Sequence, residues 1–185
     1  MSKMLVLGGY GAQGSATVMW LVKEPDVSEV ICAGRNLEKA KRFADKLKSH
    51  KVRPMKVDAW KPNEVLEAAK GVNVVINMTA AWIGERSPTL EVMDAAFKNG
   101  AHYVDAAAAT REEEDKMLEL SDRWKDAGLT AIFDLGKTPG ITNMYARYAA
   151  DRLDRVDEIH VKTCLDVMSD KEFLVTWSPV AALPG

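Results

Sequence analysis

The chain has 185 residues, of which 47% are hydrophobic and 28% are charged, an ordinary composition for a globular protein with one core. Lys and Arg total 25 and Asp and Glu total 27, so the net charge of −2 leaves no basic excess for nucleic acid or an anionic membrane. No apolar run approaches the ~20 residues of a membrane-spanning helix. The composition therefore argues against nucleic acid and membrane as partners.

The sequence contains no pattern typical of a disulfide framework, a metal site or a signal peptide. Cys32 and Cys164 form no CxxC pair, and the three histidines have no metal-ligand spacing, so we expect neither a disulfide framework nor a metal site. Lys3 already opens an apolar run, which leaves no room for a signal peptide. We expect a protein of the reducing cytoplasm.

Strand and helix patterns alternate along residues 1–153. Short apolar runs predict strands at residues 3–8, 29–33, 52–57, 72–77, 102–105 and 130–133. Apolar spacings of three and four, with Pro and Gly at the ends, predict helices at residues 12–23, 37–47, 62–70, about 90–99, about 117–127 and 141–153. Trp20 and Trp124 fall on apolar helix faces and are expected in the core. The alternation predicts an α/β fold of the Rossmann type, doubly wound around a mostly parallel sheet.

The pattern changes after Asp157. Residues 158–165 (EIHVKTCL) alternate apolar and polar side chains, which is typical of a half-exposed antiparallel strand, and residues 173–177 (FLVTW) are a possible partner. We interpret residues 154–185 as the first strands of a second, α+β antiparallel domain, incomplete here. A terminal hairpin packed on the first domain is the alternative.

A glycine loop follows the first strand and opens the first helix. Its sequence, Gly9-Tyr10-Gly11-Ala12-Gln13-Gly14, fits the dinucleotide-binding pattern G-x-G-x-x-G. In that pattern the first glycine permits the tight turn, the second admits the pyrophosphate and the third lets the helix pack on the strand. The free N–H groups of the helix then face the phosphates. We expect the whole loop to bind a dinucleotide.

The end of the second strand selects between NAD and NADP. NAD-binding domains usually place Asp or Glu there, but this chain has Gly34-Arg35-Asn36, with Lys39 one turn later. A guanidinium can bind a 2′-phosphate through two hydrogen bonds, whereas a carboxylate would repel it. We therefore expect NADP, with NAD less favoured, bound through Arg35 and Asn36. Arg35 stacking on the adenine or lying in solvent is the alternative.

Other candidates follow the later strands. Asp58 can accept a hydrogen bond from the adenine or cap the next helix. The small residues of Met78-Thr79-Ala80 can let the cofactor pass close to the backbone. Asp105 and Lys137 lie at the same sheet edge, where ligands of open α/β sheets bind, and are the candidates for substrate or nicotinamide contact. Their structural alternatives are a helix cap for Asp105 and a solvated turn for Lys137.

Several segments resemble the saccharopine dehydrogenase-like family over nearly the whole chain. They are residues 9–14, 35–40 (RNLEKA), 99–105 (NGAHYVD), 136–143 (GKTPGITN) and 177–179 (WSP). The glycine loop alone is unspecific, and the HYVD and PGITN segments are more telling. The resemblance implies NAD(P)-dependent chemistry at a C–N bond of saccharopine, lysine or a carboxylated polyamine, and it places Pro139 and Gly140 near the nicotinamide.

The chain departs from that family in two ways. Members are usually about twice as long, so most of the domain that binds substrate and forms the homodimer is missing here. Many members carry Asp where this chain has Gly34-Arg35, which again points to NADP. Residues 106–109 are four alanines, so no polar substrate ligand can be assigned there.

Two other function classes compete with this interpretation. Gly8, Gly11 and Gly14 also fit the G-x-x-G-x-x-G of short-chain dehydrogenases. That class needs Tyr-x-x-x-Lys, and Tyr103, Tyr145 and Tyr148 are followed at that spacing by residues other than Lys, so it is disfavoured. A non-enzymatic NADP sensor, or an inactive half-protein, is distinguished from a dehydrogenase only by experiment.

Overall fold

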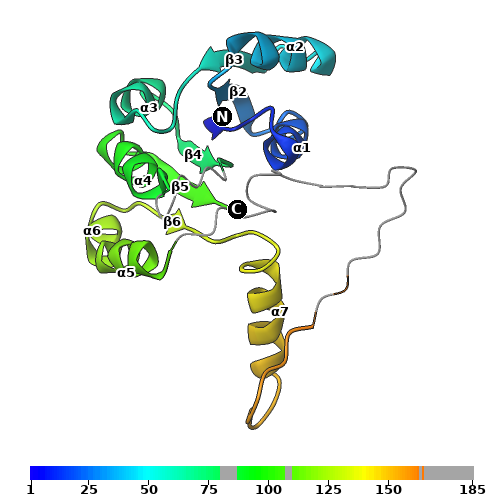
Figure 1. Cartoon of the computed structure of the whole chain (residues 1–185), viewed down its shortest axis with the longest axis vertical. Helices are drawn as coiled ribbons and strands as arrows, with labels where there is room; N and C mark the ends of the chain where they lie inside the picture. The colour runs from blue at the N-terminus through cyan, green and yellow to red at the C-terminus, as the bar shows by residue number, and fades with distance from the viewer. Residues whose placement is uncertain (80–86, 107–109, 163, 165–185) are drawn as a thin grey trace, which may run out of the picture.

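The computed structural model describes residues 1–79, 87–106, 110–162 and 164. It contains a six-stranded sheet in the order β3-β2-β1-β4-β5-β6, and every pair of neighbours is parallel (Figure 1). The strands are β1 Ser2–Leu7, β2 Val27–Gly34, β3 Val52–Lys56, β4 Val74–Asn77, β5 His102–Asp105 and β6 Ala131–Ile132. This order is that of a doubly wound Rossmann fold, as predicted.

Seven helices connect or follow these strands in the described residues. They are α1 Ala12–Leu21, α2 Leu37–Leu47, α3 Pro62–Ala68, α4 Thr89–Lys98, α5 Arg111–Glu119, α6 Ser121–Asp126 and α7 Ile141–Ala150. The helices α1 and α2 cover one face of the sheet, and α3 to α6 cover the other (Figure 1). None of these helices is long and apolar enough to cross a membrane.

The central strands are buried on both faces, which explains their nearly continuous apolar sequence. Alternate residues of β1 belong to the two cores: Leu5 and Leu7 lie in the larger one, with residues of α3 and α4, and Val6 lies in the other, with Val18 of α1. Each of these side chains is at most 1% exposed. Trp124 of α6 lies at 4% exposure in the larger core, as expected.

The placement of Trp20 in the core was wrong, because this side chain is 66% exposed. Trp20 follows the buried Val18 by two positions, which rotates it about 200° around the helix to the solvent side. There Lys23 lies over its ring, with the Nζ atom 4.6 Å from the ring centroid. The helix predicted near residues 117–127 is also two helices, α5 and α6, which meet at Leu120.

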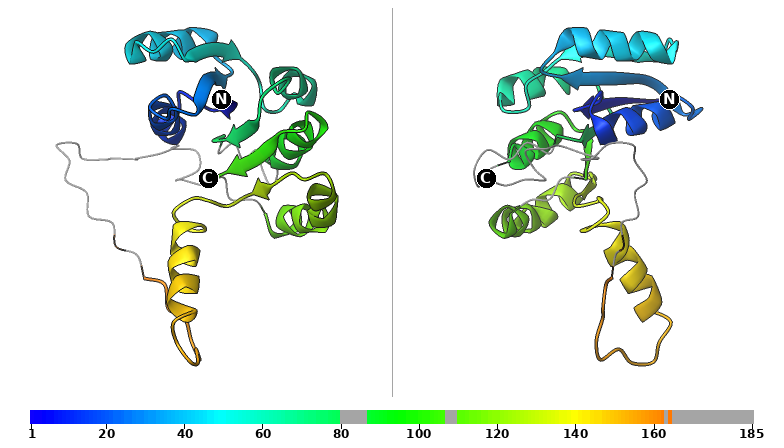
Figure 2. Two further views of the ribbon diagram at one scale, coloured as in Figure 1. Left: turned by 180° about the vertical axis from the view of Figure 1, so that it is seen from behind. Right: turned by 45° about the vertical axis from the view of Figure 1, so that its right-hand side comes forward.

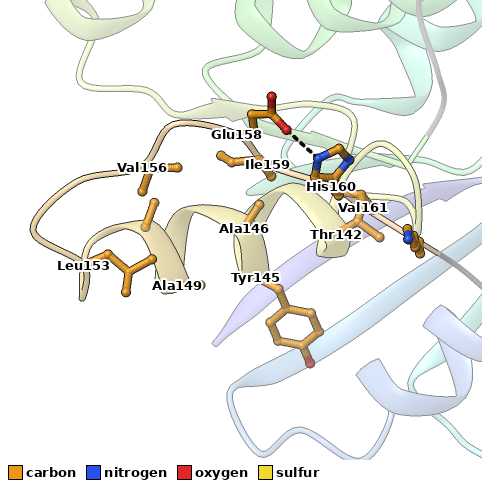
Figure 3. Close-up of a pocket in the computed structure, with 12 residues that line it drawn as sticks. Thr142, Tyr145, Ala146, Ala149, Leu153, Val156, Glu158, Ile159, His160 and Val161 are labelled. Carbon is orange, nitrogen blue, oxygen red and sulfur yellow. Dashed lines mark hydrogen bonds and ion pairs between the residues drawn. The ribbon is translucent and has the colours of Figure 1, made fainter.

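The helix α7 projects away from the α/β body (Figures 1 and 2). None of its residues, all of which the structure describes, is buried. After α7 the chain turns back, and residues 156–162 run beside the helix; a groove of about 420 Å³ lies between them (Figure 3). The strand predicted at residues 158–165 is not formed over its described part, residues 158–162 and 164, which is exposed. Residues 173–177 lie outside the described residues.

Candidate functional site

The glycine loop joins β1 to α1 where the strand order reverses, between β2 and β4. Ligands of doubly wound sheets bind beyond the strands at this point. The left-handed residue of the turn is Gly8, with φ of +72°, rather than Gly9 as expected. A Cβ atom at Gly8 would lie 2.8 Å from the carbonyl oxygen of Met78, so this glycine also allows the segment after β4 to approach.

Two motif glycines are required by close packing. A Cβ atom on Gly9 would lie 3.0 Å from the Sγ atom of Cys32, and one on Gly14 would lie 2.1 Å from the carbonyl oxygen of Gly8. Burial raises the pKa of the Cys32 thiol to about 11, so this cysteine is a packing residue. Because Gly14 has no Cβ atom, the first turn of α1 can pack closely against the end of β1.

The N-terminus of α1 is open. Its N-cap is Gly11, which has no side chain to accept from the first-turn N–H groups, and Ala12 and Gln13 are exposed. In contrast, Asn36 caps α2 and Thr110 caps α5 through their side-chain oxygens. The uncapped first turn carries a partial positive charge and unpaired donors, which fit a pyrophosphate.

Tyr10 fixes the turn at the end of β2. Its ring lies over Gly34, where a Cβ atom would come within 2.6 Å of Cε1, and its hydroxyl oxygen accepts from the backbone N–H of Asn36 at 2.8 Å. The side-chain oxygen of Asn36 accepts from the N–H of Lys39 at 3.0 Å. Gly34 is needed for this contact, a role that the motif alone did not reveal.

Arg35 lies in the turn that Tyr10 attaches to the glycine loop. Its side chain is exposed and has no acceptor within the residues that the structure describes, and Lys39 is exposed nearby in sequence. No carboxylate ends β2. A guanidinium can bind a 2′-phosphate through two hydrogen bonds, so the residues present fit NADP.

Asp58 shapes the turn that precedes α3. Its side-chain oxygen accepts from the N–H of Trp60 at 3.1 Å, and its own N–H donates to Glu64 at 2.9 Å. The N-cap of α3 is Lys61, so Asp58 does not cap that helix directly. Its contact with adenine stays a prediction.

The segment after β4 extends along the glycine loop. The N–H of Met78 donates to the carbonyl oxygen of Leu7 at 3.0 Å. Thr79 donates to the side-chain oxygen of Asn77 through both its N–H and its hydroxyl. Ala80 lies outside the described residues.

Asp105 ends β5 and is 1% exposed. One carboxylate oxygen accepts from the Tyr103 hydroxyl at 2.7 Å and the other from the N–H of Asp134 at 2.8 Å. Burial first, and then the charge of Asp105, raise the pKa of Tyr103 well above its usual value, so the phenol stays protonated. Asp105 is not the cap of α5, because that position belongs to Thr110.

Residues 136–143 form a tight turn between β6 and α7. The carbonyl oxygen of Lys137 accepts from the N–H and hydroxyl of Thr142, while the Lys137 side chain is exposed. Gly140 has φ of +126°, and a Cβ atom there would lie 2.1 Å from the carbonyl oxygen of Gly136. Pro139 is half-buried beside it, and the side chains of Lys137 and Thr138 before it are exposed.

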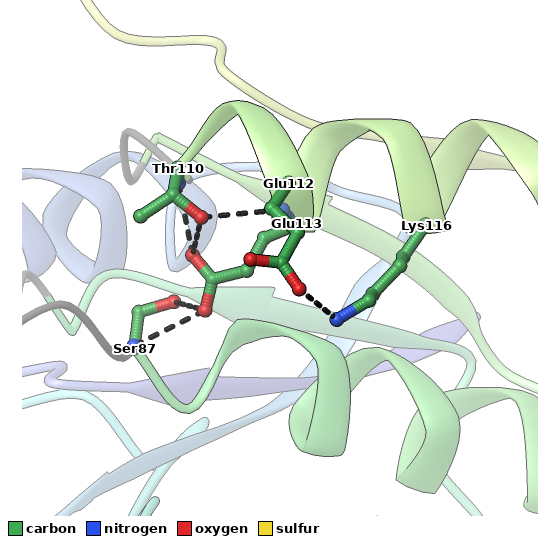
Figure 4. Close-up of polar contacts among 5 residues, drawn as sticks. All are labelled: Ser87, Thr110, Glu112, Glu113 and Lys116. Carbon is green, nitrogen blue, oxygen red and sulfur yellow. Dashed lines mark hydrogen bonds and ion pairs between the residues drawn. The ribbon is translucent and has the colours of Figure 1, made fainter.

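Glu113 ties together the segments that lead into α4 and α5 (Figure 4). One carboxylate oxygen accepts from the N–H and hydroxyl of Ser87, and the other accepts from the N–H and hydroxyl of Thr110. Burial by itself would raise the pKa of Glu113, but these hydrogen bonds outweigh it and hold the pKa below 4.5.

Comparison with protein families finds one that covers most of the chain. The saccharopine dehydrogenase NADP binding domain matches residues 4–132. Two relatives are carboxyaminopropylagmatine dehydrogenase of Synechocystis sp., 27% identical over 173 residues, and carboxynorspermidine synthase of Vibrio cholerae, 25% identical over 195 residues. Each match covers 90% of this chain, but only 42% and 45% of the respective relative.

Solved structures with a similar backbone include triphenylmethane reductase of Citrobacter sp., with a TM-score of 0.52 and 24% identity over 71% of this chain and 47% of that one. Its complex with NADP(H) gives a TM-score of 0.51 and 22% identity, over 80% of this chain and 55% of that one. These similarities support the Rossmann fold. The match over residues 4–132 shows that the chain belongs to the saccharopine dehydrogenase family and contains its NADP-binding domain.

Proposed function

We propose that this chain is the cofactor half of an NADP-dependent oxidoreductase that acts on a C–N bond of an amino acid or amine. The observation that carries the proposal is the uncapped α1 N-terminus, with Arg35 in the turn that Tyr10 attaches to the glycine loop, within a family that contains dehydrogenases. The names of the two relatives indicate carboxylated amines as the substrate class. The chain spans less than half the length of those relatives, so the substrate itself is part of the proposal.

The cofactor would lie across the carboxyl edge of the sheet. The first-turn N–H groups of α1 bind the pyrophosphate, Arg35 with Asn36 binds the 2′-phosphate side, and Asp58 accepts from the adenine. Met78, Thr79 and Ala80 border the middle of the cofactor, and Pro139 with Gly140 borders its nicotinamide. When bound, NADP(H) accepts or donates the hydride.

Lys137 and Asp105 have different parts in this proposal. Lys137 is exposed in the turn that we propose lies beside the nicotinamide. From there its ammonium group would contact a substrate carboxylate or the reacting amine. Asp105 is 1% exposed, and its carboxylate accepts from the Tyr103 hydroxyl and the N–H of Asp134, so in this proposal it acts through its neighbours. We propose Lys137 as the group that contacts the substrate.

Residues 154–185 would begin the domain that completes the substrate site and forms a homodimer. The exposed apolar side chains of α7 support this proposal, since Met144, Tyr145 and Tyr148 are 59–67% exposed. Apolar surface of this kind usually marks a contact with another part of an assembly. For the 185-residue chain alone we expect NADP binding with little turnover of lysine or saccharopine, as an NADP sensor would also show. Detectable turnover by this chain alone would contradict that expectation.

The test is a fluorescence titration of the chain with NADPH and NADH. We expect tighter binding of NADPH, and Arg35→Ala should weaken NADPH by roughly ten- to a hundredfold, the range for charge-assisted hydrogen bonds, and leave NADH unchanged. Arg155→Ala is the matched control, because Arg155 lies beyond α7 and its side chain is 83% exposed. Tighter binding of NADH, or an Arg35 variant with unchanged NADPH affinity, would contradict the proposal.

A further inference from the structure

A line of buried hydrogen bonds runs beneath the carboxyl edge of the sheet. Asn77 ends β4 and pairs in register with Asp105, the last residue of β5. Tyr103 lies two residues before Asp105, so its side chain is on the same face. The three side chains are at most 1% exposed. They form one polar unit inside an otherwise apolar core.

The bonds of this unit all point the same way. The Thr79 hydroxyl and N–H donate to the Asn77 oxygen, the Asn77 amide donates to the Tyr103 oxygen at 3.3 Å, and the Tyr103 hydroxyl donates to Asp105 at 2.7 Å. Each donor along the line therefore faces the next acceptor, ending at the carboxylate. Successive hydrogen bonds of this kind polarise and strengthen one another.

The two ends of the line are the two loops that flank the proposed nicotinamide position. At one end Thr79 lies against the glycine loop, where a Cβ on Gly8 would be 3.4 Å from its Cγ2 atom. At the other end Asp105 accepts from the N–H of Asp134 through its side chain and from the N–H of Leu135 through its carbonyl oxygen. The turn containing Gly140 follows directly.

Stability alone does not account for this arrangement. Burying a carboxylate is costly before its hydrogen bonds offset the loss, and apolar side chains of similar volume often stabilise a core as well or better. A satisfied polar network instead fixes one arrangement of the groups that it joins. Here those groups are the segments after β4 and β6.

We propose that Asn77, Tyr103 and Asp105 are positioning residues that set the loop after β4 against the loop after β6, and so place the nicotinamide end of the cofactor. The inference rests on the proposed function. The adenine end has its own supports, Tyr10 and the cap of α2, and is independent of this line.

The test compares two ligands in the 185-residue chain. NADPH occupies the whole site, whereas adenosine 2′,5′-bisphosphate carries the adenine and the 2′-phosphate without the nicotinamide. Tyr103→Phe removes only the hydroxyl that links Asn77 to Asp105. We expect about tenfold weaker NADPH binding, the size of one buried hydrogen bond, and less than about twofold change for the bisphosphate. Tyr148→Phe, on the exposed face of α7, should change neither.

A second variant keeps the inference testable if Tyr103→Phe unfolds. Thr79→Val removes the hydroxyl donor at the half-buried end of the line and keeps the N–H donor, so we expect a smaller loss of about threefold for NADPH alone. Equal losses for both ligands, or no loss for NADPH in either folded variant, would overturn the inference and leave the proposed function standing. Failure of the wild-type chain to bind either ligand would overturn both.

Discussion

The α/β body contains β1 to β6 and α1 to α6, and the arm is α7 with the following residues 151–162. Both contain apolar residues at similar helical spacing, yet they differ in burial. In the body, Val92, Met93 and Ala96 of α4 are at most 1% exposed because the sheet lies beneath them. In α7, Ile141, Met144 and Tyr148 are 48–60% exposed. Periodicity therefore predicts a helix in both places, but burial depends on a partner that only the body supplies.

The candidate site lies where the two regions meet. The glycine loop and Arg35 belong to the body, and the turn with Gly140 connects the body to α7. In the proposed function, the body forms the adenine and pyrophosphate side by itself. The proposed substrate side lies toward α7, after which the proposed second domain begins.

The largest effect is expected from truncating a core side chain. Leu5→Ala should lower the free energy of unfolding by about 2–5 kcal/mol, because Leu5 is fully buried in β1. Leu153→Ala, on the arm at 61% exposure, should change it by less than about 0.5 kcal/mol. Urea unfolding measures both. Similar losses would show that the arm is as tightly packed as the body.

Gly14→Ala should be the next most damaging change. The new Cβ would lie 2.1 Å from the Gly8 carbonyl, so α1 must move away from β1, at a cost of about 1–3 kcal/mol and more than about tenfold in NADPH affinity. Gly100→Ala has open space around its Cβ and only a strained φ of +67°, so it should cost about 1–2 kcal/mol and keep NADPH affinity. Urea unfolding and NADPH titration distinguish them, and equal loss of affinity would contradict the steric role.

Glu113→Gln tests the carboxylate that joins α4 and α5. Because the folded-state pKa lies below the unfolded value, Glu113 contributes stability that is present above about pH 4.5 and is lost as pH falls through the folded pKa. At pH 7 we expect the variant to be about 1 kcal/mol less stable, with the gap to wild type closing in acid. Urea unfolding between pH 3 and 7 measures this gap. If the difference in unfolding free energy between wild type and variant were the same at every pH, the stabilising role of the Glu113 charge would be refuted. Glu112→Gln, on the exposed side of the same turn, is the control.

The smallest effect on stability is expected on the arm. Met144→Lys with Tyr148→Lys should change the free energy of unfolding by less than about 0.5 kcal/mol, since both side chains are exposed. The double variant should bind less of a hydrophobic dye and associate less at high concentration, because it divides an apolar surface. Dye fluorescence and sedimentation measure these properties, and unchanged dye binding would contradict the account of α7 as an uncovered face.

The sequence predicts the body well because its elements are local and repeated. The bounds of the helix at residues 37–47 and the strand at residues 102–105 agree with α2 and β5, and the strand-loop-helix context of the glycine motif is confirmed. The prediction that Trp20 lies in the core was wrong because α1 is apolar along most of its length and its sequence gives no clear periodic face. The prediction of a strand from residue 158 was wrong over its described part. A segment with alternating apolar and polar residues forms a strand only when a neighbouring strand pairs with it.

The glycines of the candidate site and Arg35 could be predicted from the sequence, but the buried side chains that hold the surrounding loops were harder to predict. Tyr103 and Asp105 are two residues apart in a strand, and Asn77 ends another apolar strand, so their shared face could have been noticed. Their hydrogen bonds depend on the register between β4 and β5, which the sequence does not give. The shift of the left-handed turn from Gly9 to Gly8 likewise depends on how closely Met78 approaches.

Hydrogen–deuterium exchange with and without NADPH tests the central comparison most directly. The account predicts slow exchange in β1, β4 and β5, fast exchange in α7, and new protection on NADPH binding at residues 11–14 and 34–36. Residues 144–162 should exchange at the same rate in both states. Protection confined to α7, or none at the glycine loop, would contradict the assignment of the cofactor site to the body.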